Sequence, residues 1–182
     1  DLYQSKFEII VIEKTSEILN NSKIFNKEEA EKTIKKKNIN LMKNYSVIEI
    51  NDEHILLSNN LNQVKKFPYF DVIWTAGIKP NLPEFNQQIP KINNKILVNN
   101  NLQLQNHPNI FVLGDISQIE SNNTYPVTAQ VAMQQGEHVA LNLKLLINDE
   151  KLLPFEFNDN GEMMSLGIGE ASISVSYTHL TL

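Results

Sequence analysis

The chain has 182 residues, of which 41% are hydrophobic and 20% are charged, as is typical of a globular protein. Its formal net charge of -5 argues against a nucleic-acid partner, because such proteins carry a basic face. The absence of cysteine excludes a disulfide framework, a thiolate metal site and a redox-active dithiol. The four histidines lack ligand spacing, so we expect no metal site.

The first 45 residues show a strand, a helix and a second strand. Residues 7–13, FEIIVIE, form a continuous apolar run, which predicts a strand buried on both faces of a parallel sheet. Residues 26–38 predict a helix with Asn26 as N-cap and Glu29 completing a capping box. Residues 39–44 predict the next strand.

A hairpin and another strand follow. Residues 45–60 predict two strands around a turn at residues 51–53, and residues 70–77, FDVIWTAG, predict a buried strand that ends at Gly77. The order strand, helix, strand, hairpin, strand is typical of the second half of a nucleotide-binding α/β unit that carries a small antiparallel excursion.

The second half of the chain begins with a connection rich in proline and asparagine, residues 80–108, which includes a predicted strand pair at residues 95–104. A short apolar strand at residues 109–115 ends in Gly-Asp, and a helix is expected from about residue 128 to residue 147. Two further strands are expected around Gly161.

Three strand ends carry candidate binding residues. Glu13 at the end of the first strand is either an acceptor for ribose hydroxyls or a solvated acid. Gly77 either lets the backbone pass close to a planar ligand or makes a plain turn. Gly114 and Asp115 end a buried strand where α/β folds bind ligands, although Asp115 is also suited to a turn or a helix cap.

The stretch PVTAQVAMQQG, residues 126–136, predicts a helix capped by Thr128. The helix N-terminus carries partial positive charge, so it suits an electron-accepting ring. Gln130 and Gln134 are four residues apart and share one helix face, which either lines a polar opening or forms an exposed polar stripe.

Three segments in this order, FDVIWTAGIKPN, NIFVLGDIS and AQVAMQQG, resemble type II NAD(P)H:quinone oxidoreductases, flavoproteins of the pyridine nucleotide-disulfide oxidoreductase-like superfamily with two dinucleotide-binding domains. The AQxAxQxG pattern of that family matches residues 129–136 at every fixed position. Residues 152–167, LLPFEFNDNGEMMSLG, further resemble the cyanobacterial and plastid branch, which is linked to reduction of demethylated phylloquinone precursors.

The resemblance implies an α/β, Rossmann-like, three-layer flavoprotein fold. Residues 1–79 would belong to the NAD(P)H-binding domain and residues 80–174 to the FAD-binding domain with the start of the C-terminal region. Residues 175–182 are interpreted as a non-native tail. The glycine-rich phosphate loops are absent, so we expect a C-terminal fragment with little activity by itself.

The resemblance also implies roles for single residues. Asp115, with Gly114 beside it, would bind the ribityl chain of FAD, and Thr128, Ala129 and Gln130 would lie against the isoalloxazine ring. Gln130 and Gln134 would border the quinone and are the residues implied in catalysis. Glu13 would hold the ribose of NADH or NADPH, and Gly77 would lie near the nicotinamide.

As a whole, the resemblance implies a type II, non-proton-pumping NAD(P)H dehydrogenase that passes a hydride to FAD and two electrons to a membrane quinone. Such an enzyme would lie peripherally on the cytoplasmic side of a thylakoid or plasma membrane, and a homodimer is one arrangement it allows. Two alternatives remain: another FAD- and NAD(P)-dependent reductase of the superfamily, or a non-catalytic NAD(H)-binding sensor.

Overall fold

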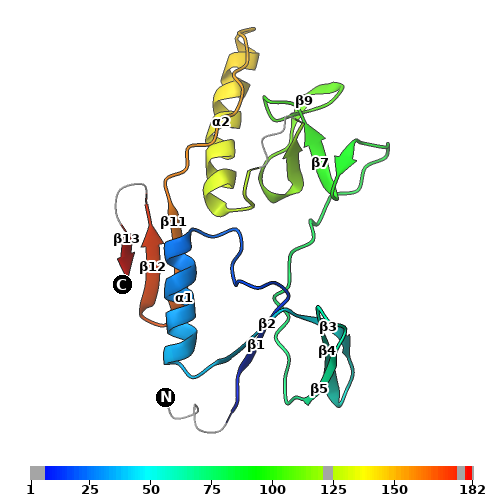
Figure 1. Ribbon diagram of the computed structural model, residues 1–182. Coiled ribbons are helices and arrows are strands. Elements are labelled where there is room, and N and C mark those ends of the chain that lie inside the picture. The colour runs from blue at the N-terminus through cyan, green and yellow to red at the C-terminus, as the bar shows by residue number, and fades with distance from the viewer. Residues whose placement is uncertain (1–6, 121–124, 176–178, 182) are drawn as a thin grey trace. The chain divides into compact units, whose positions relative to one another are not determined.

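The computed structural model describes residues 7–120, 125–175 and 179–181 (Figure 1). The chain divides into two compact units. The first unit contains the described residues up to Trp74 together with those from Asn160 onward, and the second runs from Thr75 to Asp159. The strands near the C-terminus therefore pack with the first unit, although they are adjacent in sequence to the second. The predicted α/β class is confirmed, with the strands distributed over four small sheets.

The first unit begins with the predicted parallel strand pair, β1 (Ile10–Glu13) and β2 (Asn40–Lys43), whose residues pair one to one. The helix α1 (Ile24–Lys36) connects these strands, as the sequence predicted. A parallel pair needs a crossover of this kind, because the chain must return to the starting edge before it can run in the same direction again.

The predicted start of α1 is wrong. The N-cap is Lys23, whose side chain makes no capping hydrogen bond, and Asn26 lies inside the helix with its side chain completely buried. The Glu162 carboxylate accepts hydrogen bonds from the Lys23 N–H and from Asn26 Nδ2, both at 2.8 Å. Ser172 donates a hydrogen bond of 2.7 Å to Asn26 Oδ1. Asn26 is unavailable as a local cap because its amide binds partners more than 130 residues away.

The predicted hairpin is confirmed as β3 (Tyr45–Ile50) and β4 (His54–Asn59), and a third antiparallel strand, β5 (Val64–Pro68), completes this sheet. The sequence reading missed β5, which has only one partly buried residue, at Phe67.

The buried strand predicted at residues 70–77 is wrong. The segment has no regular strand, and Phe70, Ile73 and Trp74 are 91%, 86% and 59% exposed. Its apolar pattern is that of a buried strand. The segment follows the β3–β4–β5 sheet, in which both edges of β4 are already paired, and no described strand pairs with it. Without a partner for its backbone groups, an apolar run does not form a strand.

The first unit is completed by β11 (Glu162–Gly167) and β12 (Glu170–Ser174), with β13 (His179–Thr181) paired to β12. Two strands were predicted on either side of Gly161. The strand before Gly161 is wrong, because residues 151–160 contain no strand, and the region after Gly161 forms both β11 and β12, which turn at residues 168–169. The residues interpreted as a non-native tail lie partly outside the described residues.

The second unit is built on one sheet and one long helix. The sheet has the order β10–β7–β8–β9, with β6 on β7. Its strands are β6 (Lys91–Ile92), β7 (Lys95–Val98), β8 (Gln103–Leu104), β9 (His107–Phe111) and β10 (Ser117–Ile119). The helix is α2 (Ala129–Ile147), close to its predicted bounds.

The core of the second unit joins this sheet to α2. It contains Ile89, Ile96, Val98, Leu102, Leu104, Val112, Ile119, Val139 and Phe155. Val139 comes from α2 and Phe155 from the segment after it, so both are held to the sheet by apolar burial. This packing sets the position of the α2 N-terminus beside the end of β9.

An extended segment, residues 151–158, runs back along α2 and is here called the strap. The buried Asn142 on α2 donates to the Leu153 carbonyl at 2.9 Å and accepts from the Leu153 N–H at 3.0 Å. Phe155 donates its backbone N–H to the Asn100 carbonyl at 2.8 Å and stacks edge-on against Tyr125. The strap is therefore held by hydrogen bonds at Leu153 and Phe155 without belonging to a sheet.

Candidate functional site

The chain turns sharply after β9, in the short 3₁₀ helix η1 (Gly114–Ile116). Gly114 has φ +72°, a left-handed conformation that glycine adopts without steric cost. Hydrogen bonds with two side chains fix the peptide groups on either side of its Cα atom. The Gly114 N–H donates to Gln135 Oε1 at 2.6 Å, and the Gly114 carbonyl accepts from the Ser117 hydroxyl at 2.9 Å. The direction in which Asp115 leaves the sheet is therefore closely determined.

The helix α2 begins beside this turn. Thr128 is its N-cap, as predicted, and its hydroxyl oxygen accepts a hydrogen bond of 3.3 Å from the Val131 N–H. Ala132 lies within van der Waals distance, 3.8 Å, of the position that a Cβ atom on Gly114 would occupy. The partial positive charge of the helix N-terminus thus lies next to the Gly114 turn.

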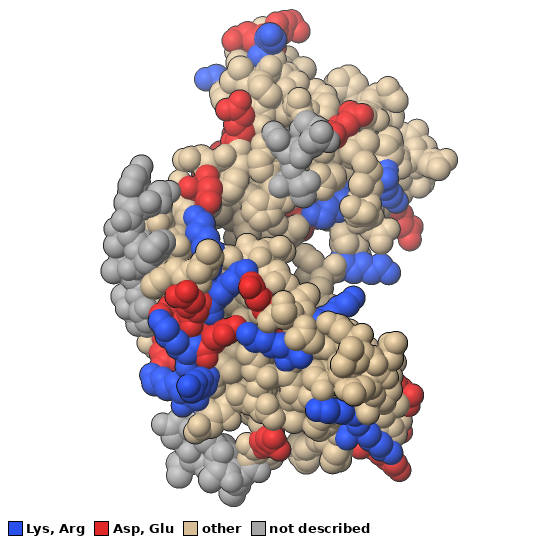
Figure 2. Space-filling model, in the orientation of Figure 1, with Lys and Arg blue, Asp and Glu red and all other residues tan. Residues whose placement is uncertain are grey.

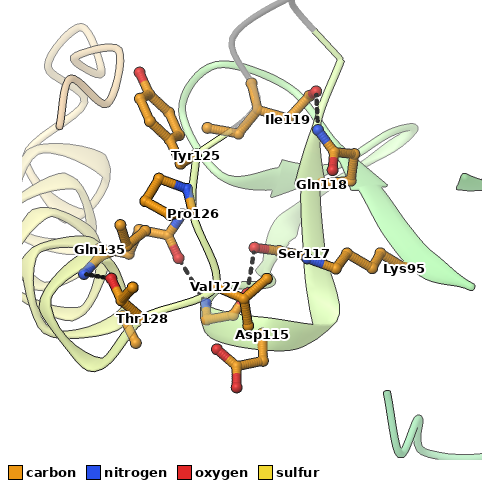
Figure 3. Close-up of a pocket in the computed structure, with 13 residues that line it drawn as sticks. Lys95, Asp115, Ser117, Gln118, Ile119, Tyr125, Pro126, Val127, Thr128 and Gln135 are labelled. Atoms are coloured by element: carbon orange, nitrogen blue, oxygen red, sulfur yellow. Dashed lines mark hydrogen bonds between the residues drawn. The ribbon is translucent and has the colours of Figure 1, made fainter. Parts of the chain in front are cut away.

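The turn and the helix start enclose a pocket (Figure 3). Its walls include Gly114, Asp115, Lys95, Val127, Thr128 and Gln135. In Figure 3 the Asp115 side chain extends away from the turn, whereas Gln135 reaches from α2 toward it. The Asp115 carboxylate is exposed and makes no hydrogen bond or ion pair with any described residue. The pocket therefore combines a helix N-terminus with a carboxylate that is available to accept hydroxyl groups.

The structure brings part of the predicted site together. Gly114, Asp115 and Thr128 all line the pocket, and Ala129 and Gln130 follow in the first turn of α2. These residues come from segments more than ten positions apart in the sequence.

Gln134 was predicted to line a polar opening or to lie in an exposed polar stripe. In the structure its side-chain amide is bound to the strap. Its Nε2 donates to the Asn158 carbonyl at 2.8 Å, and its Oε1 accepts from the Asn158 N–H at 2.9 Å. Both polar ends of the amide are thus paired with the strap, and any contact with a substrate would compete with these bonds.

Glu13 lies in the first unit, at the end of β1. Its Oε1 accepts hydrogen bonds from the Thr15 backbone N–H at 2.8 Å and the Thr15 hydroxyl at 2.7 Å. These bonds, led by the one from the Thr15 backbone, lower the pKa of Glu13 despite partial burial. The carboxylate is therefore held ionised and oriented, with a smaller contribution from the Lys14 backbone.

Gly77 lies in the second unit and has φ +79°, with open space where a side chain would extend. The conformation explains why glycine occurs there. Glu13 and Gly77 belong to different units.

Sequence reasoning missed Gln135 and Ser117. Both are buried, and both bind Gly114. Gln135 lies four residues from both Val131 and Val139, on the buried side of α2. A polar residue within an apolar stripe was the signal that could have identified it, because a buried amide requires hydrogen-bond partners.

A metal site, a membrane-spanning helix and a nucleic-acid surface have less support among the described residues. No three His, Cys, Asp or Glu side chains gather there as a metal cluster would require. Within the same residues, no helix has the length and apolar character needed to cross a membrane. Figure 2 shows lysines and acids interspersed on the visible face rather than gathered in one basic stripe.

Comparison with known proteins identifies the family. Residues 2–136 match the model for pyridine nucleotide-disulphide oxidoreductases, and the chain belongs to this family. The match includes β1, the Gly114 turn and the start of α2.

Curated relatives agree with the predicted resemblance. The chain is 38% identical over 113 residues to the alternative NAD(P)H-ubiquinone oxidoreductase C1 of Arabidopsis thaliana, covering 58% of this chain and 22% of that protein. It is 31% identical over 126 residues to the type II NADH:quinone oxidoreductase of Staphylococcus haemolyticus, covering 66% of this chain and 31% of that protein. The aligned part is therefore less than a third of either relative.

Solved structures support the fold. The structure of NDH2 from Plasmodium falciparum in complex with NADH matches with a TM-score of 0.80 at 18% identity. The match covers 96% of this chain and 51% of that one. The chain thus has the fold of about half of that protein.

Proposed function

We propose that these residues form part of an FAD-dependent NAD(P)H:quinone oxidoreductase of the type II, non-proton-pumping class. Support comes from the family membership, from two relatives that carry this kind of name, and from the predicted AQxAxQxG pattern at residues 129–136. The proposed reaction oxidises NAD(P)H and reduces a quinone, for which a demethylated naphthoquinone is our candidate. The observation that carries the proposal is the position of the unpaired Asp115 carboxylate beside the N-terminus of α2.

The pocket residues fit a flavin. Asp115 offers an acidic acceptor for the hydroxyl groups of a ribityl chain, and Gly114 permits close approach of a ligand to the backbone. Thr128, Ala129 and Gln130 place the positive end of the α2 dipole where an electron-accepting ring would gain from it. A bound flavin would supply the two-electron chemistry that links NAD(P)H oxidation to quinone reduction.

The other two substrates are assigned to residues outside this pocket or at its edge. Glu13 would accept hydrogen bonds from the ribose hydroxyls of NADH, and its charge would repel the 2′-phosphate of NADPH. Gly77 would leave room for the nicotinamide. Gln130 and Gln134 would border the quinone, and Gln134 would do so while holding the strap in place.

The proposed enzyme binds a lipophilic substrate, so we place it peripherally at a membrane surface, on the cytoplasmic side. A homodimer is compatible with this arrangement. The membrane assignment follows from the chemistry of a quinone, which partitions into the bilayer.

The test uses the complete gene product that contains these residues. Asp115→Ala should lower the flavin content of the purified protein and weaken flavin binding about tenfold, as expected for loss of a charge-assisted hydrogen bond. NADH:quinone turnover should fall in parallel. Gln88→Ala, at an exposed site outside the pocket lining, serves as the control. A wild-type protein without bound flavin or quinone turnover would overturn the proposal.

The same variant separates the alternatives. A non-catalytic NAD(H) sensor would use Glu13 and Gly77 but would not need Asp115. For such a sensor the affinity for NADH is the property to measure, and Asp115→Ala would leave it unchanged. A different reductase of the superfamily would bind flavin through Asp115 but would not turn over quinone.

A further inference from the structure

The buried side chain of Gln135 has one polar atom engaged and one without a partner. Its Oε1 accepts the Gly114 N–H at 2.6 Å, and the residue is only 3% exposed. Because a backbone N–H can only donate, this bond also determines the orientation of the amide, so that Nε2 is the atom turned away from Gly114. Within the described part of the chain, Nε2 has no hydrogen-bond partner.

Although Gln135 is buried as a residue, its Nε2 is not one of the completely buried unpaired atoms of the described residues, so this donor keeps some accessible surface. Gln135 lines the same pocket as Gly114, Asp115 and Thr128. The residues that line the pocket thus include a donor, the Gln135 Nε2 group, and an acceptor, the Asp115 carboxylate. Both are attached to the Gly114 turn, one through a hydrogen bond and the other through the chain.

We infer that Gln135 contacts the ligand of this pocket directly and also positions the Gly114 turn. This inference rests on the proposed function, in which the ligand is a flavin nucleotide. Oε1 holds the Gly114 peptide, with Ser117 holding its carbonyl from the other side. Nε2 donates to an oxygen or nitrogen acceptor of the flavin nucleotide, while Asp115 accepts from a hydroxyl group.

Two substitutions separate these roles in the complete gene product. At a pH where the new carboxyl is ionised, Gln135→Glu keeps an oxygen acceptor for Gly114 but removes the donor. Gln135→Met preserves the approximate shape and removes both. Gln88→Met is the matched control, since Gln88 is exposed and makes no hydrogen bond with a described residue. The readouts are hydrogen–deuterium exchange at the Gly114 amide and the dissociation constant of FAD.

We expect Gln135→Glu to keep slow exchange at Gly114 but to weaken FAD binding about tenfold, a change typical of one lost buried hydrogen bond. Gln135→Met should raise the exchange rate and weaken binding at least as much. Unchanged FAD affinity in both variants would overturn the donor role, and unchanged exchange in Gln135→Met would overturn the positioning role. If the wild-type protein binds no FAD, the proposed function and the donor role both fall, while the exchange measurement still decides the positioning role.

Discussion

Gln134 and Asn158 are joined by two hydrogen bonds, in which the side-chain amide of Gln134 pairs with both the carbonyl and the N–H of Asn158. This geometry resembles one rung of a β-ladder, with a side chain in place of the second strand. It connects the face of α2 that carries the AQxAxQxG pattern to the end of the strap. A residue proposed to border the substrate therefore also determines where the neighbouring chain lies.

Gln134→Leu should release the end of the strap. Two exposed hydrogen bonds are lost, and we expect local opening of residues 156–159 to become easier by about 1 kcal/mol. Limited proteolysis and hydrogen exchange at Asn158 would measure this change. Gln88→Leu should have no effect at that position. Protection of Asn158 equal to that of the wild type would show that the Gln134 bonds do not hold the strap.

Asn142→Ala should destabilise the second unit more strongly. The Asn142 side chain is completely buried, and its removal leaves the Leu153 N–H without its side-chain acceptor. We expect the free energy of unfolding to fall by about 2 to 3 kcal/mol, measured by chemical denaturation. Asn86→Ala, at an exposed site, is the matched control and should change it by less than about 0.5 kcal/mol.

Glu162 should make the first unit sensitive to acid. Burial by itself raises the pKa of Glu162, but hydrogen bonds from the Lys23 N–H, Ser22 and Asn26 outweigh it, so the pKa is lowered from 4.5. A lowered folded-state pKa stabilises the protein above the unfolded-state value, and this stabilisation is lost as the pH falls through the folded-state value.

Between about pH 6 and pH 3, the free energy of unfolding should therefore fall less steeply in Glu162→Gln than in the wild type. At neutral pH the variant should be less stable by about 1 kcal/mol, since the group is only partly buried. Glu53→Gln is the control, because Glu53 is exposed and its carboxylate binds no described residue. Parallel pH profiles for the wild type and Glu162→Gln would contradict the assignment.

Gly161→Ala should disrupt the C-terminal strands. Gly161 has φ +106°, and a Cβ atom there would lie 2.6 Å from the Ser174 carbonyl oxygen, which belongs to the backbone of β12 and cannot easily move. We expect a loss of about 2 to 3 kcal/mol in thermal denaturation. Gly169→Ala tests the positive φ alone, because Gly169 has φ +74° and open space around it. Equal losses in both variants would mean that the contact with Ser174 is unimportant.

Glu13→Gln should change the choice of nucleotide in the complete protein. With the charge removed, repulsion of a 2′-phosphate disappears, and kcat/KM for NADPH should rise about tenfold relative to NADH. Steady-state kinetics with both nucleotides would measure the ratio, and Glu8→Gln at an exposed site is the control. An unchanged ratio would remove Glu13 from the proposed nucleotide site.

Much of the architecture was predictable because it depends on local patterns. The apolar run before Glu13, the turn at residues 51–53 and the Thr128 cap were all recognisable, since strand alternation, turn residues and capping act over a few neighbouring positions. The strand predicted to end in Gly114-Asp115 is correct only in part, because β9 ends at Phe111, its middle residues are exposed, and Gly114 and Asp115 lie in η1 just after it. The family resemblance came from ordered short segments, and the match over residues 2–136 confirmed membership of the pyridine nucleotide-disulphide oxidoreductases.

Only the tertiary structure determined which polar groups pair over long distances. Asn26 has the local sequence of a helix cap, yet it binds Glu162 and Ser172, because those partners are brought to it by the fold. Residues 70–77 have the composition of a buried strand but lack a neighbour to complete their hydrogen bonds. Gln135 was overlooked because its partner, the Gly114 N–H, lies 21 positions away. Local sequence determines what a segment prefers, and the supply of distant hydrogen-bond partners decides whether that preference is realised.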